Sequence, residues 1–180
     1  RWIKAIEHST EVCSKASRRW FVSDRESDIY AVYTCVHEPE NYFVVRAAQN
    51  RIVQDKKGGQ RLFDFIESKE IIGQYDLEVV DKKTQEKEVL AIGIKIGKVL
   101  INKPPDNTTY STQSVELGFV EARSIGDKRV HWTLLTNKEV STVEDALVVI
   151  ERYKQRWHIE VFFGLLKSKG LNVELSQFTT

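Results

Sequence analysis

The sequence contains no methionine, only two cysteines and no apolar run that approaches 18 residues. Cys13 and Cys35 lack the Cys-x-x-Cys spacing of a zinc knuckle and give no disulfide framework, so reduced cytosolic thiols are expected. The chain also opens without a signal-peptide pattern, and we expect no membrane association. Because even the first residue is not methionine, we expect the chain to be a piece of a longer protein.

The net charge is close to zero and says little about partners. Lys and Arg number 27 against 26 for Asp and Glu, which gives +1, while a 41% hydrophobic content over 180 residues is enough for a real core. The distribution of charge is more informative, because five basic residues lie between Arg152 and Lys169 against the single acid Glu160. Such a strip fits phosphates, or it is a solvated helix face.

A long helix is predicted over residues 141–170. Ser141 and Glu144 form a capping-box pattern, apolar residues follow the helical spacing, and Gly170 suits the C-terminal end. In such a helix four polar residues at offsets of three, four and seven positions share a stripe of roughly 60° of arc: Tyr153, Arg156, Glu160 and Lys167. These charges either pair among themselves or hold a metal ion beside a phosphate chain.

The first 47 residues predict a helix, a strand, a helix and a second strand. The four elements are expected over residues 2–13, 19–24, 25–35 and 42–47, which is the order of an α/β sheet. A polar loop over 49–59 and a short helix over 61–68 follow, and residues 74–122 are mostly β in pattern. Residues 131–136 then return as a strand that leads into the long helix.

Asp24 stands at the carboxyl end of the first predicted strand, where α/β folds place ligands. One interpretation is that it caps the next helix. The other is that it is a metal ligand, because Mg²⁺ prefers carboxylate oxygens, and Glu160 on the long helix is a candidate second ligand.

Four motifs together resemble the bacterial cut-and-paste DDE transposases of the insertion-sequence group with a Y-R-E-K signature. That signature, Tyr-x2-Arg-x3-Glu-x6-Lys, is met at every spacing by Tyr153, Arg156, Glu160 and Lys167. The other three motifs follow in the family's order: a DREAD-like segment at 24–28, an FVVR strand at 43–46 and a tryptophan strand at 132–136.

The resemblance implies an α/β, RNase H-like core that a β-rich insertion interrupts. Residues 1–47 are then the first part of this core, residues 48–130 the insertion, and residues 131–180 the remainder of the core with the catalytic helix. It also implies a DNA transposase that cleaves and joins phosphodiester bonds at transposon ends, with double-stranded DNA and a second copy of the protein as partners. The protein would act in the bacterial cytoplasm, at the nucleoid.

The resemblance gives each matched residue a role. Asp24 and Glu160 resemble two catalytic carboxylates that hold Mg²⁺ or Mn²⁺ in a two-ion site. Arg46, Tyr153 and Arg156 resemble a phosphate clamp, and Lys167 a further DNA-backbone contact. Trp132 resembles an aromatic residue that stacks on a base flipped from the duplex, or it is a core residue of its strand.

The family's first aspartate has no counterpart upstream of Asp24, so the two-ion site is expected to be incomplete in this chain, which alone would not transpose DNA. The alternatives are a non-catalytic DNA-binding module of the same fold, another RNase H-like nuclease, or a structural α/β domain whose helix charges only pair.

Overall fold

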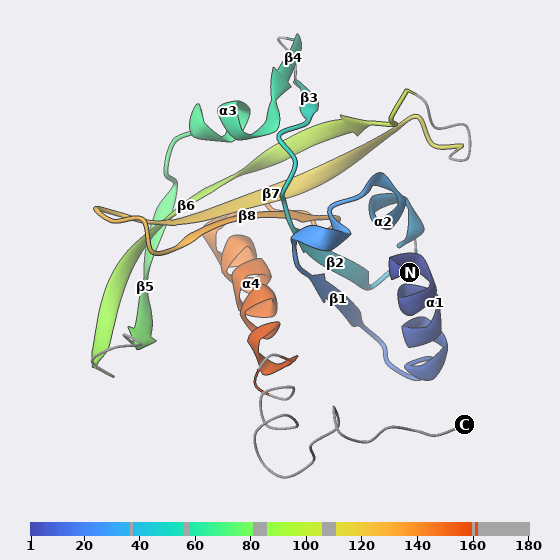
Figure 1. The fold of residues 1–180 in the computed structure, drawn as a ribbon, viewed down its shortest axis with the longest axis horizontal. Coiled ribbons are helices and arrows are strands. Elements are labelled where there is room, and N and C mark those ends of the chain that lie inside the picture. The colour runs from blue at the N-terminus through green and yellow to red at the C-terminus, as the bar shows by residue number, and fades with distance from the viewer. Residues whose placement is uncertain (37, 56–57, 81–85, 106–110, 160, 162–180) are drawn as a thin grey trace, which may run out of the picture.

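The computed structural model describes residues 1–36, 38–55, 58–80, 86–105, 111–159 and 161. In the described part of the chain the strands join one eight-stranded sheet, and helices lie on both of its faces (Figure 1). The protein is therefore of mixed α/β class. None of the helices formed by these residues is long and apolar enough to span a membrane.

The first part of the chain alternates between helix and strand, as predicted. It contains α1 (Trp2–Val12), β1 (Arg19–Ser23), the short 3-10 helix η1 (Arg25–Ser27), α2 (Tyr30–Cys35) and β2 (Asn41–Arg46). β1 and β2 pair in parallel. The single helix expected over 25–35 was wrong, because Asp28 and Ile29 leave helical geometry and separate η1 from α2.

The middle of the chain is mostly β, also as predicted. It contains β3 (Ile52–Asp55), β4 (Gly58–Arg61), α3 (Leu62–Glu67), β5 (Gly73–Val80), β6 (Lys87–Asn102) and β7 (Ser114–Ser124). The loop expected over 49–59 was wrong in part, because β3 and the start of β4 lie there. β3 pairs with β6 and buries Val53 fully, a distant pairing that the local polar composition does not reveal.

The strand order along the sheet is β1-β2-β8-β7-β6-β3-β4, and β5 pairs with β6. β8 (His131–Thr136) lies between β2 and β7 and is antiparallel to both. The strands of residues 48–130 are thus hydrogen-bonded into the same sheet as β1, β2 and β8. The division of the chain at residues 47 and 130 stays a prediction.

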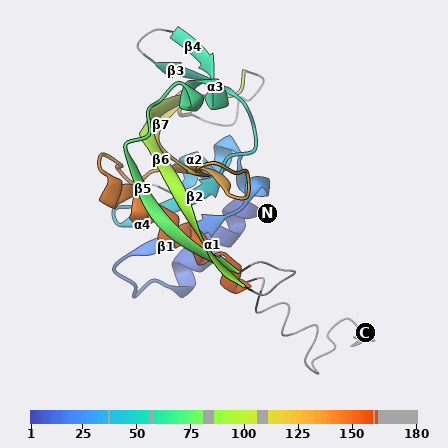
Figure 2. The same ribbon diagram turned by 90° about the vertical axis from the view of Figure 1, so that its left-hand side faces the viewer.

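Two hydrophobic cores fill the two faces of this sheet, and side chains that alternate along each strand supply them in turn. In β2, Phe43 and Val45 face the core beneath α1, α2 and α3, whereas Val44 faces the core beneath the C-terminal helix. Figure 2 shows the sheet from its side, with β5 and β6 in front. Gly97 in β6 is needed for close packing, because a Cβ there would lie 2.5 Å from the ring of Phe119.

The C-terminal helix α4 (Val143–Lys154) begins at a capping box, but one residue later than predicted. Thr142 and Asp145 form the box in place of Ser141 and Glu144. Ala146, Val149, Ile150 and Tyr153 are the buried residues of the helix. Residues 155 and 156 form a turn with i→i−3 hydrogen bonds, and residues 157–159 are again helical, so the predicted 141–170 helix is confirmed in its described part except for this interruption.

Candidate functional site

Strand direction brings three of the predicted site residues to one edge of the sheet. Asp24 follows β1 and Arg46 ends β2, and because these strands are parallel both residues lie at the same edge. β8 runs antiparallel to β2, so it begins at that edge, with Trp132 as its second residue. This is the edge where α/β folds place their ligands.

The C-terminal end of α4 brings two further predicted residues to Asp24. The Tyr153 hydroxyl lies 3.4 Å from Asp24 Oδ1, a long hydrogen bond in which the phenol donates. Arg156 Nη1 lies 3.5 Å from Asp24 Oδ2 and forms an ion pair with it. An acid from the first strand therefore meets a phenol and a guanidinium from a helix more than a hundred positions away in the sequence.

Tyr153 is the buried centre of this cluster, with a relative exposure of 1%. Trp132 packs edge-on against its ring, with 5.5 Å between the ring centroids. The Arg156 guanidinium carbon lies 5.8 Å from the centroid of the same ring.

Burial raises the pKa of the Tyr153 phenol, and the Asp24 charge raises it further, while Arg46 and Arg156 oppose this shift. Since the shift is upward, the phenol stays protonated near neutral pH and serves as a neutral hydrogen-bond donor.

Both interpretations of Asp24 remain compatible with its geometry. It is the N-cap of η1 and accepts a 2.9 Å hydrogen bond from the Arg25 backbone N–H through Oδ1. Its side chain is 42% exposed, and a carboxylate has about four acceptor positions, so capacity remains for a cation. A hard divalent cation fits this donor, and Arg156 is the group with which it would compete at Oδ2.

Two predicted site residues, Glu160 and Lys167, lie outside the described residues. The structure therefore does not place the second predicted metal ligand. Among the residues that it does describe, no group of three or more histidine, cysteine or acidic side chains is arranged to hold a metal ion.

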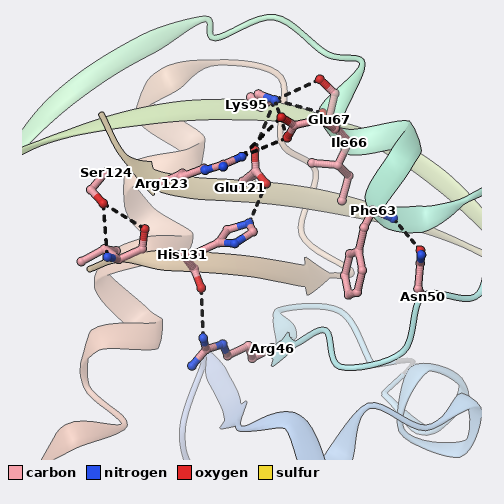
Figure 3. A network of polar contacts seen from close by, with 11 residues as sticks. Arg46, Asn50, Phe63, Ile66, Glu67, Lys95, Glu121, Arg123, Ser124 and His131 are labelled. Carbon is pink, nitrogen blue, oxygen red and sulfur yellow. Dashed lines mark hydrogen bonds and ion pairs between the residues drawn. The ribbon is translucent and has the colours of Figure 1, made fainter. Parts of the chain in front are cut away.

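A polar network that the sequence analysis missed extends from the same edge across β8, β7 and β6 (Figure 3). His131 Nε2 lies 2.9 Å from Glu121 Oε1, and Lys95 Nζ lies 3.4 Å from Glu121 Oε2. Glu67 of α3 pairs in turn with Lys95 and with Arg123. The buried member, Glu121, carried a sequence signal, since it shares the strand phase of apolar residues in β7 that face α3.

Arg46 connects this network to the Asp24 cluster. Its Nη2 donates a 3.0 Å hydrogen bond to the His131 carbonyl oxygen, as Figure 3 shows. Arg46 thereby joins the end of β2 to the start of β8.

No family model matches the chain. The class that fold and site define is a mixed α/β protein with an acid, two arginines and two aromatic residues gathered at one edge of its sheet.

Proposed function

We propose that this chain is the catalytic core of a DDE-type DNA transposase, which cleaves phosphodiester bonds at transposon ends with Mg²⁺ or Mn²⁺. On this proposal the β1-α2-β2 unit and α4 belong to an RNase H-like core, and β3–β7 belong to its β-rich insertion. The partners are duplex DNA and, in the DNA complex, a second copy of the protein.

The observation that carries the proposal is the contact of Asp24 with Tyr153 and Arg156. In the sequence these residues belong to two separate motifs of the resemblance, and nothing local requires them to meet. A structural helix whose charges pair only among themselves would have no need of an acid from the end of β1. The contact therefore supports a site built from both motifs.

The proposed roles follow from the chemistry of each group. Asp24 would hold a divalent cation together with Glu160, and when bound such an ion neutralises charge at the attacked phosphodiester and activates a nucleophilic oxygen. Arg46 and Arg156 offer planar forks to phosphate oxygens, and Tyr153 offers a neutral donor. Trp132, which packs against the Tyr153 ring, would stack on an unstacked base.

The test measures metal-dependent cleavage of a DNA duplex by the complete gene product. The duplex carries the genomic sequence that flanks the gene. Asp24→Asn and Glu160→Gln should each lower the cleavage rate by at least about a hundredfold, because each removes a charged ligand and keeps its shape. Asparagine also caps helices, so Asp24→Asn should preserve the start of η1. DNA affinity in a metal-free buffer should remain close to that of the wild type.

Glu26→Gln is the matched control, because Glu26 is an exposed acid of the same segment that receives no catalytic role. It should cleave at the wild-type rate. Near-normal cleavage by Asp24→Asn would overturn the proposal. DNA binding without cleavage by the wild-type protein would instead favour the non-catalytic DNA-binding module.

A further inference from the structure

A second feature of the same sheet edge is a cavity of about 340 Å³ that borders Arg25, the residue after Asp24, and Phe63 of α3. It is lined by residues of η1, β2, the segment after β2, α3 and β8: Arg25, Arg46, Ala47, Ala48, Phe63, His131 and Thr133. We infer that this cavity, the basic pocket, binds one unpaired nucleotide of a DNA strand, with its phosphate on the arginines and its base on Phe63. The inference rests on the proposed function and adds a subsite to it.

The charged residues that line the basic pocket are two arginines. A histidine also lines it, and none of its described members is an acid. Within the described part of the chain, neither the Arg25 nor the Arg46 side chain forms an ion pair, so both retain donors for an anion. Two guanidinium groups around one cavity suit a phosphate, which takes bidentate hydrogen bonds.

Phe63 supplies the aromatic wall, and the chain holds it in place from two sides. The Phe63 backbone N–H donates a 2.9 Å hydrogen bond to Asn50 Oδ1, and the Leu62 N–H donates one of 2.9 Å to the Arg51 carbonyl. The Phe63 side chain is partly buried against the core beneath α3. Figure 3 shows Phe63 on α3, His131 on β8 and Arg46 bonded to the His131 carbonyl oxygen.

The opposite wall is also anchored. The His131 imidazole is tied to Glu121, whose side chain is only 4% exposed, and the His131 carbonyl accepts from Arg46. Because these groups are fixed before any ligand arrives, little ordering entropy opposes binding.

The size and chemistry of the basic pocket favour a single nucleotide over a duplex. A cavity of a few hundred Å³ suits a small ligand, and a duplex presents phosphates but no open base faces. An aromatic ring beside cations is the usual arrangement for unpaired bases, which stack without regard to sequence. The pocket shares Arg46 with the Asp24 cluster, because Arg46 also acts on the Tyr153 phenol.

The test compares two probes by fluorescence anisotropy with this chain in a metal-free buffer. One is a blunt duplex of about 20 base pairs, and the other is the same duplex with a single-stranded extension of about three nucleotides. The wild type should bind the extended probe at least about fivefold more tightly. Phe63→Leu should abolish this gain and leave blunt-duplex affinity nearly unchanged, and Arg25→Gln should reduce the gain severalfold.

Two controls separate the pocket from general effects. Phe63→Tyr keeps the ring and should keep the gain, and Lys15→Gln removes one exposed charge outside the pocket and should leave the affinity ratio unchanged. Circular dichroism checks that each variant folds. If Phe63→Leu does not fold, the affinity ratio of Arg25→Gln tests the pocket, because Arg25 is exposed and its substitution should not affect folding.

Equal affinity of the wild type for both probes, or an undiminished gain in Phe63→Leu or in Arg25→Gln, would overturn the inference. If blunt-duplex binding and metal-dependent cleavage are intact in that case, the proposed function stands and only the basic pocket is refuted. Failure of the wild-type chain to bind either probe would count against both.

Discussion

At the residue scale, the two outer acids of the segment 24–28 have different surroundings. Asp24 is partly exposed beside Arg156, whereas the Asp28 side chain is fully buried. Asp28 Oδ2 accepts hydrogen bonds of 2.6 and 2.8 Å from the backbone N–H groups of Ala48 and Gln49. Its Oδ1 accepts from Arg51 and from the Tyr33 hydroxyl. Asp28 thus fixes the chain after β2, from which part of the basic pocket is built.

Asp28→Asn should lower the free energy of unfolding by about 3–5 kcal/mol, because it leaves the largely buried Arg51 guanidinium without its ion pair. It also turns the NH₂ group of the new amide toward groups that are themselves hydrogen-bond donors. Urea denaturation followed by circular dichroism measures this. Glu26→Gln, at an exposed neighbour, should change stability by less than about 0.5 kcal/mol. A loss below about 1 kcal/mol in Asp28→Asn would contradict the structural role assigned to the carboxylate.

The sequence singled out Asp24 at the end of its predicted strand, but nothing in the short polar segment indicated that Asp28 is buried. Asp28 differs from Asp24 because the backbone N–H groups of residues 48 and 49 bond to it. Their position depends on the path of the chain after β2. The period of a helix did predict that Tyr153 and Arg156 share one stripe, because that period is a local property. Their place near Asp24 followed only from the resemblance. Phe63 and Arg25 were not predicted, because only the tertiary fold brings them to one cavity.

At the scale of elements, the position of α4 depends on its first turn. Lys138 Nζ lies 2.6 Å from Asp145 Oδ1, and Asp145 Oδ2 accepts from the backbone N–H groups of Ser141 and Thr142. Ser141 and Thr142 both have a carboxylate three residues later, so the sequence alone fits either start. In the structure the helix starts at the later of these two positions, and Asp145 of its capping box also bonds to Lys138, which lies before the helix.

The same cap predicts an acid-dependent stability. The hydrogen bond from Lys138, followed by that from the Ser141 backbone, lowers the pKa of Asp145 to about 2. A carboxylate whose pKa is depressed on folding contributes stability that is present above its unfolded pKa of about 4 and is lost as the pH falls toward about 2.

Asp145→Asn should therefore lower the free energy of unfolding by about 1 kcal/mol at pH 7, the usual loss for a capping interaction. The difference from the wild type should shrink between about pH 4 and about pH 2, as the wild-type carboxylate takes up its proton. Thermal or urea unfolding at several pH values provides the measurement. A difference that stays constant down to pH 2 would exclude Asp145 as the titrating group.

At the scale of the whole molecule, one sheet carries both parts of the proposed core and the β-rich region between them. β8 pairs with β2 on one side and with β7 on the other, so the edge at Asp24 and the network at Glu121 belong to one rigid layer. The sequence predicted that residues 74–122 are mostly β but not that β3 and β7 extend the same sheet. Such pairings join residues far apart in the chain, and no local pattern specifies them.

The net charge of +1 conceals two arginines at this edge, Arg46 and Arg156, which both lower the pKa of the Tyr153 phenol. If both arginines contact phosphates, each Arg→Gln substitution should weaken duplex binding and reduce the slope of log K against log salt by about 1. The measurement is anisotropy titration of this chain with a blunt duplex over a series of salt concentrations.

Arg129→Gln is the matched control, because Arg129 lies in the turn before β8 and pairs with Glu88 and Asp127. It removes the same charge at another place, so its slope should equal that of the wild type. Identical slopes for all four proteins would mean that the DNA contacts a different face of the molecule, and the edge at Asp24 would then no longer account for binding.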